Sequence, residues 1–351
     1  MGVRYLPRLT VSTVVPSFNR AHLLERALRS AVAECQPGDE VIVVDDGSTD
    51  NTEAVVRAFG SPVRYLSGEH RGSGAARNVG IRAASGDLVA FLDSDDEWIP
   101  GKLSWQRAVL EQFPGILFLF SEFGHVTSTN DRLPHQLSTW HSDVRSWDDI
   151  LGPGIASATI AGMSASAPPF RLHVGRLYES LINHFYICTS TFIVRREEAG
   201  DALQCAEDVE MFDEYETFAR LANRGLAGFM DCDTEWNHAH RGARLTDADH
   251  ATRADVLVKI TERVWGTDEA YLSLHRDEYE AAVDNRRLRK VRSLLGKGRR
   301  EEARQELTQC FHPPRSFALL TYVPSGVVTL SAAVRRRLRS WRAMGTRSPW
   351  P

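Results

Sequence analysis

Short apolar runs alternate with segments of helical periodicity over the first 120 residues of the chain. The apolar runs have the length of buried β-strands and cover residues 11–15, 41–44, 63–66 and 88–92. Between them, apolar residues recur at helical spacing, most clearly over residues 20–33 and 51–59. Strands that alternate with helices predict an α/β domain with a mostly parallel central sheet flanked by helices.

After about residue 250 the pattern changes to consecutive helices, clearest over residues 270–294 and 299–310. We therefore expect two parts, an α/β domain over residues 1–249 and an α-helical C-terminal appendage over residues 250–351. Within the first part, residues 121–185 include two low-complexity patches from which no chemistry can be read.

Acidic residues follow the apolar run at residues 88–92. Asp93, Asp95 and Asp96 stand at its carboxyl end, where open α/β sheets bind their ligands. Carboxylates this close repel one another unless a cation lies between them. Ligation by oxygen alone favours Mg²⁺ or Mn²⁺, and a solvated acidic turn is the alternative interpretation.

A second acidic pair, Asp45 and Asp46, follows the run at residues 41–44. We expect Asp50 to cap the next helix, with Glu53 as its capping-box partner. This assignment leaves Asp45 and Asp46 without a local structural role. Two acidic pairs at one edge of a sheet require a counter-ion or a ligand.

A glycine-rich turn at residues 71–78 leads into a further predicted helix. It suits either phosphate binding by free backbone N–H groups or close packing of a helix on the sheet. Neither a Gly-x-Gly-x-x-Gly nor a Gly-Lys-Ser/Thr motif follows the first strand, which disfavours dinucleotide-binding and P-loop folds.

Composition and charge indicate the class of protein and its surroundings. The chain is 42% hydrophobic and 25% charged, as is usual for globular proteins, and its five cysteines form no Cys-x-x-Cys pair. With no export signal at the amino terminus, we expect a cytoplasmic protein. Residues 285–351 carry 16 Lys and Arg against three Glu, and the arginines at 335–342 suit equally a helix on the anionic inner face of a membrane and a solvated basic face.

Four motifs, in this order and at these spacings, resemble the family 2 glycosyltransferases. They are residues 14–19, 44–50, 74–80 and 91–96. The resemblance implies a GT-A fold that binds a nucleotide-diphosphate sugar with a divalent metal, Mn or Mg, and inverts the anomeric centre.

The resemblance also implies roles for individual residues. Asp46, with Asp45, is expected at the nucleotide base, and Asp93 at the ribose and metal, with Asp95 as a direct metal ligand. Arg71 or Arg77 is expected to approach the diphosphate. The remaining predicted substrate-binding positions are Pro16, Asn19 and Trp98.

The catalytic base is expected in the second half of the domain. Residues 213–222 resemble a family helix that begins with an acidic pair, usually Glu-Asp; here the order is reversed, to Asp213 and Glu214. By position Glu214 is the base, with Asp213 beside it. Asp208 is a nearby competitor, and stabilisation of the helix amino terminus is the structural alternative. Residues 237–246 resemble the family's loop over the donor, in which His240 matches a metal-ligand position.

These expectations combine into an inverting glycosyltransferase that moves a sugar from a nucleotide-diphosphate sugar to a hydroxyl of a glycan or lipid-linked acceptor, in surface or exopolysaccharide biosynthesis. Residues 1–120 would form the nucleotide-sugar half and residues 121–249 the acceptor half; no nucleic-acid partner is expected. Trp140, Trp147, Phe170 and Tyr178 suit either stacking on sugar rings or the core.

Two alternative functions can be compared with this glycosyltransferase prediction. A phosphotransferase with an Asp-x-Asp-x-Thr motif is disfavoured because Glu97 stands in place of the Thr. A non-catalytic sugar-nucleotide or glycan-binding protein on the same fold is the other alternative. The three acidic sites argue against it, but the reversed order of Asp213 and Glu214 keeps it open.

Overall fold

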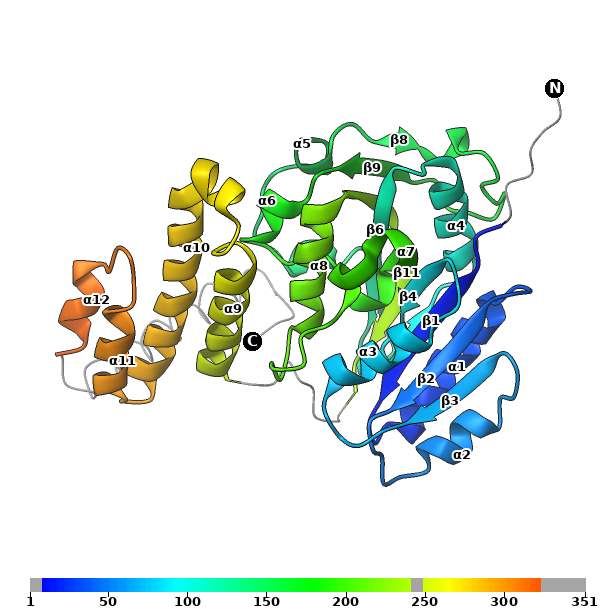
Figure 1. Cartoon of the computed structure of the whole chain (residues 1–351), viewed down its shortest axis with the longest axis horizontal. Helices are drawn as coiled ribbons and strands as arrows, with labels where there is room; N and C mark the ends of the chain where they lie inside the picture. Colours follow the sequence, from blue (N-terminus) through cyan, green and yellow to red (C-terminus); the bar gives the residue numbers. More distant parts are fainter. Residues whose placement is uncertain (1–7, 241–248, 323–351) are drawn as a thin grey trace. The chain divides into compact units, whose positions relative to one another are not determined.

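The computed structural model describes residues 8–240 and 249–322 (Figure 1). The chain comprises two compact units, residues 1–243 and 244–351. The boundary expected from the sequence, after residue 249, lies close to this division.

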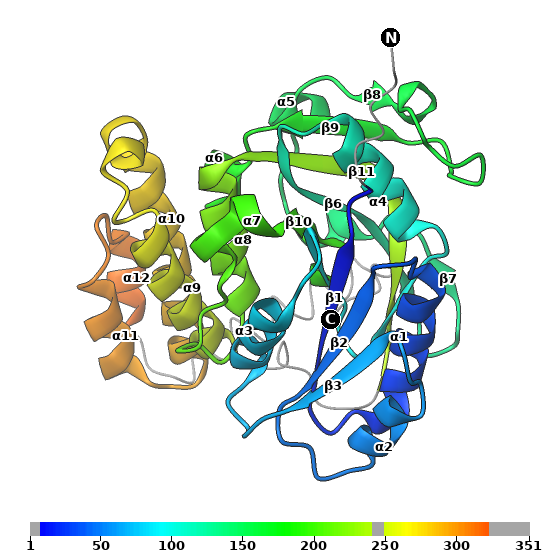
Figure 2. The ribbon, with the colours of Figure 1, turned by 45° about the vertical axis from the view of Figure 1, so that its right-hand side comes forward.

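The first unit begins with four parallel strands in the order β3-β2-β1-β4. The strands are β1 (Val11–Ser17), β2 (Glu40–Asp45), β3 (Val63–Ser67) and β4 (Leu88–Phe91), connected by α1 (Ala21–Glu34), α2 (Thr52–Arg57) and α3 (Ser73–Ala83). Helices α1 and α2 lie on one side of these strands and α3 on the other (Figure 2). The predicted β-α alternation is confirmed over this half.

Beyond β4 the sheet is mixed. Strand β10 (Ile193–Arg195) is antiparallel to β4 and to β6 (Ile116–Val126), and β11 (Leu226–His238) runs parallel to β6. The antiparallel strands β9 (Arg171–Gly175) and β8 (Ile155–Ala156) complete the order, while β5 (Asp96–Trp98) pairs with β11 and β7 (Arg132–Leu133) with β6. The predicted mostly parallel arrangement therefore applies to the first half of the sheet only.

Helices cover the second half of this sheet as well. They are α4 (Lys102–Gln112), α5 (Trp147–Leu151), α6 (Tyr178–Leu181), α7 (Arg196–Ala199) and α8 (Asp213–Arg224), with 3₁₀ turns at Leu137–Thr139, Ser157–Thr159, Thr189–Thr191 and Gly200–Leu203. Of the four aromatic residues singled out from the sequence, Phe170 and Tyr178 are buried, and Trp147 stacks on Phe229. Trp140 is 44% exposed, so it alone of the four offers a large free surface.

Two glycines of α3, one near each end of the helix, allow close packing. A Cβ on Gly80 would lie 2.3 Å from Val14 of β1, and one on Gly74 would lie 2.4 Å from the carbonyl oxygen of Ala206. Both distances are too short for any side chain. These glycines therefore let α3 approach β1 and the segment before α8, as the packing alternative predicted.

The second unit is helical, as predicted. It contains α9 (His250–Val264), α10 (Glu269–Gly296), α11 (Arg300–Leu307) and α12 (Arg315–Leu320). Asp249 caps α9 by accepting hydrogen bonds from the N–H groups of Ala251 and Thr252. A small apolar cluster that includes Val291, Leu294 and Leu307 joins α10 to α11.

Within the described part of the chain, no helix has the length and apolar character needed to cross a membrane. The arginine-rich segment 335–342, predicted to lie either on a membrane surface or in solvent, falls outside the described residues.

Candidate active site

The carboxyl ends of β1, β2 and β4 meet at one edge of the sheet. Ser17 is paired with Asp45, and Val14 with Phe91, in parallel register. The N–H of Asp46 donates to the carbonyl oxygen of Ser17. The acidic residues that follow β2 and β4 therefore emerge at the same edge, as the sequence predicted.

Asp46 holds the loop that leads into α3. Its carboxylate accepts hydrogen bonds from the backbone N–H groups of Arg71 (2.8 Å) and Gly72 (2.9 Å) and contacts Nδ1 of His70 (2.8 Å). His70 in turn stacks on Phe18. Asp46 therefore has a structural role, but with a loop about 25 residues away in the sequence and not with its neighbours in the chain.

Asp45 and Asn19 connect neighbouring loops at the same edge. Asp45 accepts hydrogen bonds from the N–H of Ser48 and, at 2.7 Å, from the hydroxyl of Tyr65. Asn19 has a φ of 53° and its side-chain oxygen accepts from the N–H of Thr49 at 2.8 Å. Both predicted substrate-binding residues thus shape the loops between the first two strands and their helices.

Asp50 binds the start of α2, although not as a capping box. Its side chain accepts hydrogen bonds from the N–H and hydroxyl of Thr52 and from the N–H of Ala21. Glu53 instead pairs with Arg57 one turn along the helix.

Arg77 is a buried cation among three acids. Its guanidinium donates to Asp93 at 2.8 Å and to Asp213 at 2.7 Å, and lies 3.5 Å from Glu214. Burial alone would lower the pKa of Arg77, but the neighbouring carboxylates, Asp213 first, raise it well above its usual value. Arg77, one of the two residues predicted at the diphosphate, therefore links the end of β4 to the start of α8.

Both carboxylate oxygens of Asp213 form hydrogen bonds. One oxygen binds Arg77, the other accepts a hydrogen bond from the hydroxyl of Ser73 at 2.9 Å, and 1% of its surface is exposed. This leaves Glu214 as the member of the acidic pair with a quarter of its side chain exposed.

Glu214 is a weak acid in this setting. Burial, and then the charge of Asp213, raise its pKa to about 8, against the lowering effect of Arg77. The competing candidate Asp208 is exposed on the segment before α8. A carboxyl group with a pKa near the working pH can exchange a proton with a bound hydroxyl.

Asp95 and His240 come together from positions 145 residues apart. Nε2 of His240 lies 2.7 Å from Oδ2 of Asp95, and Nη1 of Arg20 lies 3.6 Å from the same oxygen. The carbonyl oxygen of Asp95 accepts a hydrogen bond from Arg26. A carboxylate and an imidazole in contact, with Asp93 two residues away, match the oxygen and nitrogen donors of a divalent metal.

Trp98 does not face this site. Only 2% of its surface is exposed, and its indole N–H donates to the carbonyl oxygen of Ser190 at 2.8 Å. Trp98 is the last residue of β5 and lines a pocket on the α1 side of that strand, away from the carboxylates at the sheet edge, so its role in substrate binding stays a prediction.

The two other predicted positions differ in exposure. Arg71 is 63% exposed in its side chain and pairs with Glu207 at 2.7 Å. Pro16 is half-buried in β1 beside Val44 of β2. Arg71 thus remains the accessible cation of the predicted donor site.

Ser190, which sequence reasoning missed, supports the acidic turn from below. Its hydroxyl accepts a hydrogen bond from the N–H of Asp93 at 3.0 Å and donates to Asp96 at 2.6 Å. No local sequence signal could have identified it, since the contact joins segments nearly 100 residues apart.

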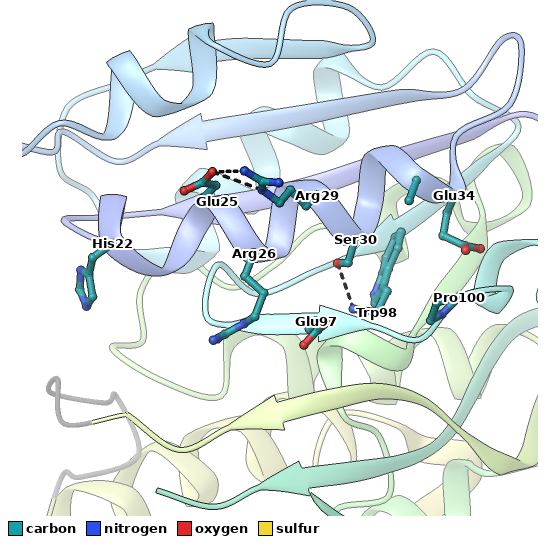
Figure 3. Close-up of a pocket in the computed structure, with 10 residues that line it drawn as sticks. His22, Glu25, Arg26, Arg29, Ser30, Glu34, Glu97, Trp98 and Pro100 are labelled. Carbon is teal, nitrogen blue, oxygen red and sulfur yellow. Dashed lines mark hydrogen bonds and ion pairs between the residues drawn. The ribbon is translucent and has the colours of Figure 1, made fainter. Parts of the chain in front are cut away.

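A pocket of about 530 Å³ lies between α1 and β5 (Figure 3). Its lining includes Arg26, Arg29, Glu34 and Glu97, and none of the carboxylates at the sheet edge. Through the hydrogen bond from Arg26 to the carbonyl of Asp95, the wall of this pocket supports the acidic turn.

Residues 12–165 match the family model described as Glycosyl transferase family 2. The matched segment covers β1 to β8, less than half of the chain, and it contains the four motifs that carry the resemblance.

Relatives support the same assignment. The chain is 38% identical over 102 residues to the Escherichia coli protein named UDP-Glc:alpha-D-GlcNAc-diphosphoundecaprenol beta-1,3-glucosyltransferase WfgD, an alignment that covers 28% of this chain and 40% of that one. The chain is also 38% identical over 105 residues to a Nostoc protein named as an uncharacterized glycosyltransferase. This alignment covers 29% of this chain and 32% of that one. The chain therefore spans less than half the length of these two relatives.

Solved glycosyltransferase structures share the fold. Staphylococcus aureus TarS 1-349, solved with UDP-GlcNAc, superposes with a TM-score of 0.53 at 16% identity and covers 85% of this chain and 88% of that one. The Pyrobaculum calidifontis mannosyltransferase PcManGT, solved with GDP-Man and Mn²⁺, gives 0.53 at 20% identity and covers 97% of this chain and 84% of that one. The predicted GT-A fold, with helices at its carboxyl end, is confirmed.

Proposed function

We propose that this chain is a metal-dependent, inverting glycosyltransferase. It would move a sugar from a nucleotide-diphosphate sugar to a hydroxyl group of an acceptor. The observation that supports this function most strongly is the position of Arg77, whose guanidinium contacts Asp93 at 2.8 Å and lies 3.5 Å from Glu214. The proposed base and the acids of the proposed donor site thus lie on either side of one fixed cation.

The protein groups account for the steps of direct displacement. Glu214 accepts the proton of the acceptor hydroxyl. At the same time the hydroxyl oxygen forms a bond to the anomeric carbon, and the bond from that carbon to the diphosphate breaks. One base with one direct attack inverts configuration. Arg77 holds Asp213 as a fixed charge, so that Glu214 is the carboxyl that takes up the proton.

A divalent metal, Mn or Mg, would supply a Lewis acid that stabilises the charge on the departing diphosphate. Asp95 and His240, with Asp93, would hold it. Arg71 would lie at the diphosphate, and the loops held by Asp45, Asp46 and Asn19 would line the site of the nucleotide base. Pro16 would contribute main chain to the same wall.

The acceptor is inferred from the relatives. The name of the E. coli relative states a lipid-linked diphosphate acceptor, so we infer a glycan or lipid-linked acceptor for this chain and a role in surface or exopolysaccharide synthesis. Such acceptors are presented at membranes, and we place the enzyme in the cytoplasm, peripheral at the inner membrane face.

The test is turnover of a panel of uridine, guanosine and thymidine diphosphate sugars, with Mn²⁺ and with EDTA. We expect metal-dependent release of nucleoside diphosphate from at least one donor. Glu214→Gln should lower this rate at least about 100-fold while thermal stabilisation by the donor persists. Glu210→Gln, an exposed neighbour outside α8, is the matched control and should leave the rate unchanged.

The outcome of this panel also separates the alternative function. Metal-dependent nucleotide binding without turnover of any donor would favour a sugar-nucleotide-binding protein, in which the acidic pair has only a structural role. Absence of both binding and turnover would refute the proposal.

A further inference from the structure

Three potential metal-ligating side chains meet beneath the proposed active site. Asp96 comes from β5, Cys188 from the segment before the 3₁₀ turn Thr189–Thr191, and Glu235 from β11. Their ligating atoms lie within 4.8 Å of one another, and the residues are 2%, 3% and 0% exposed. The cluster is therefore enclosed by protein on all sides.

One atom of this cluster has no hydrogen-bond partner. The thiol of Cys188 lies 3.0 Å from Oε1 of Glu235, whereas Oε2 of Glu235 is buried and unpaired. Asp96, in contrast, accepts hydrogen bonds from Ser190 and Asn237. A buried carboxylate oxygen without a donor is unfavourable unless a proton or a cation binds there.

The buried cation Lys102 interacts electrostatically with Glu235 but forms no ion pair with it within 4 Å. Lys102 donates to the side-chain oxygen of Gln106 at 2.6 Å, and its ammonium lies 4.4 Å from the centre of the Trp98 ring. Over residues 8–240 and 249–322, neither Asp96 nor Glu235 forms an ion pair within 4 Å. Two carboxyl groups and a thiol thus share a buried site in which no described cation forms an ion pair with them.

We propose that Asp96, Cys188 and Glu235 bind a structural Zn²⁺ ion. Zinc accepts mixed thiolate and carboxylate ligands, whereas Mg²⁺ and Ca²⁺ take oxygen alone. Ligand atoms around tetrahedral zinc are separated by roughly 3.3–3.6 Å. The 3.0 Å contact between Cys188 and Glu235 would therefore lengthen slightly, and the longer separations, none above 4.8 Å, would shorten. Oε2 of Glu235 offers the remaining donor.

This site differs in chemistry from the proposed donor site. Asp93, Asp95 and His240 supply oxygen and nitrogen, and none of them is a thiolate. The zinc ion would join β5, β11 and the segment that carries Ser190, which holds the N–H of Asp93. The inference does not depend on the proposed function, because the ion would be structural whether or not the chain turns over a sugar donor.

Metal content tests the site directly. The full-length protein is purified from cells grown with added zinc, dialysed against EDTA, and analysed by atomic emission. Because the cluster is enclosed, we expect about one zinc ion per chain to remain after ions at exposed sites are removed. A protein that retains no metal would overturn the proposal.

Cobalt substitution identifies the ligands. Protein produced with cobalt in place of zinc should show a thiolate-to-cobalt charge-transfer band in the near ultraviolet, which the donor site cannot produce. Cys188→Ser should abolish the band, and Cys310→Ser, at another buried cysteine, should keep it. Absence of the band in the parent protein, or its persistence in Cys188→Ser, would overturn the assignment.

A second variant, Glu235→Gln, tests the site in case Cys188→Ser does not fold. Glu235→Gln keeps the shape of the side chain but removes its charge, and we expect loss of retained zinc with an unchanged circular dichroism spectrum. If Cys188→Ser fails to fold, the band in the parent protein and the zinc content of Glu235→Gln still decide the question. Full zinc retention in a folded Glu235→Gln protein would remove Glu235 from the ligand set.

Discussion

Glu214 is a carboxyl group whose protonation should be visible in the pH dependence of activity. Burial and Asp213 raise its pKa to about 8, so the group is neutral below that pH and becomes a base above it. We expect the transfer rate at saturating Mn²⁺ to rise with pH up to about 8 and then level off. Measurement of rate against pH with the accepted donor checks this.

The variant Glu214→Gln supplies the control for this profile. Its residual rate should be independent of pH over the same range, because no base remains to be deprotonated. A residual rate that still rises through pH 8 would assign the titration to another group, and Asp208→Asn would then be examined.

Asp95 and His240 should determine the metal requirement. Loss of one metal ligand or of its support commonly weakens metal affinity by about 10–100-fold. We expect His240→Ala to raise the Mn²⁺ concentration for half-maximal nucleotide binding by about that factor, measured by titration calorimetry. His238→Ala is the matched control, since His238 pairs with Glu97. Equal effects of the two variants would contradict a metal-ligating role for His240.

At the scale of elements, α3 depends on Arg77. This residue joins α3 to the end of β4 and the start of α8, and removal of one partner from a buried ion pair typically costs about 3–5 kcal/mol. We expect Arg77→Ala to lower the free energy of unfolding by about that amount, measured by urea denaturation. Arg82→Ala, at an exposed position on the same helix, should change it by less than about 0.5 kcal/mol.

The elements that the sequence predicted share a strong local signal. The apolar runs of β2 and β4 and the start of α8 at Asp213 follow from residues next to one another in the chain. Strand β10 carries no such signal, because three residues show no periodicity. It is the first of several antiparallel strands in the second half of the sheet, together with β5, β7, β8 and β9.

The sequence predicted correctly that the acidic residues lie at one edge of the sheet. It did not predict which side chains and backbone groups they contact. The acids at the ends of β2 and β4 emerge at one edge because parallel strands share their direction. The partners of Asp46, Arg77 and Ser190 lie far away in the sequence, and periodicity contains no information on such contacts. The burial of Trp98 was missed for the same reason.

At the scale of the whole molecule, every residue proposed to bind the donor or the metal lies within residues 1–243. We therefore expect a chain that ends at residue 243 to bind nucleoside diphosphate and Mn²⁺ with nearly the affinity of the full chain, measured by calorimetry. Loss of binding in a folded shortened chain would show that residues 244–351 contribute to the donor site.

The insertion of β10 between β4 and β6 has a practical consequence for chimaeric enzymes. Ile193 pairs with Ala90 on one side and with Leu119 on the other, so residues 1–120 alone would leave β4 as an unpaired edge. Ser190, three residues before Ile193, accepts a hydrogen bond from the N–H of Asp93 and so holds the acidic turn after β4. Donor preference can therefore be transplanted between homologues only as a discontinuous module, in which residues 188–195 accompany the amino-terminal half.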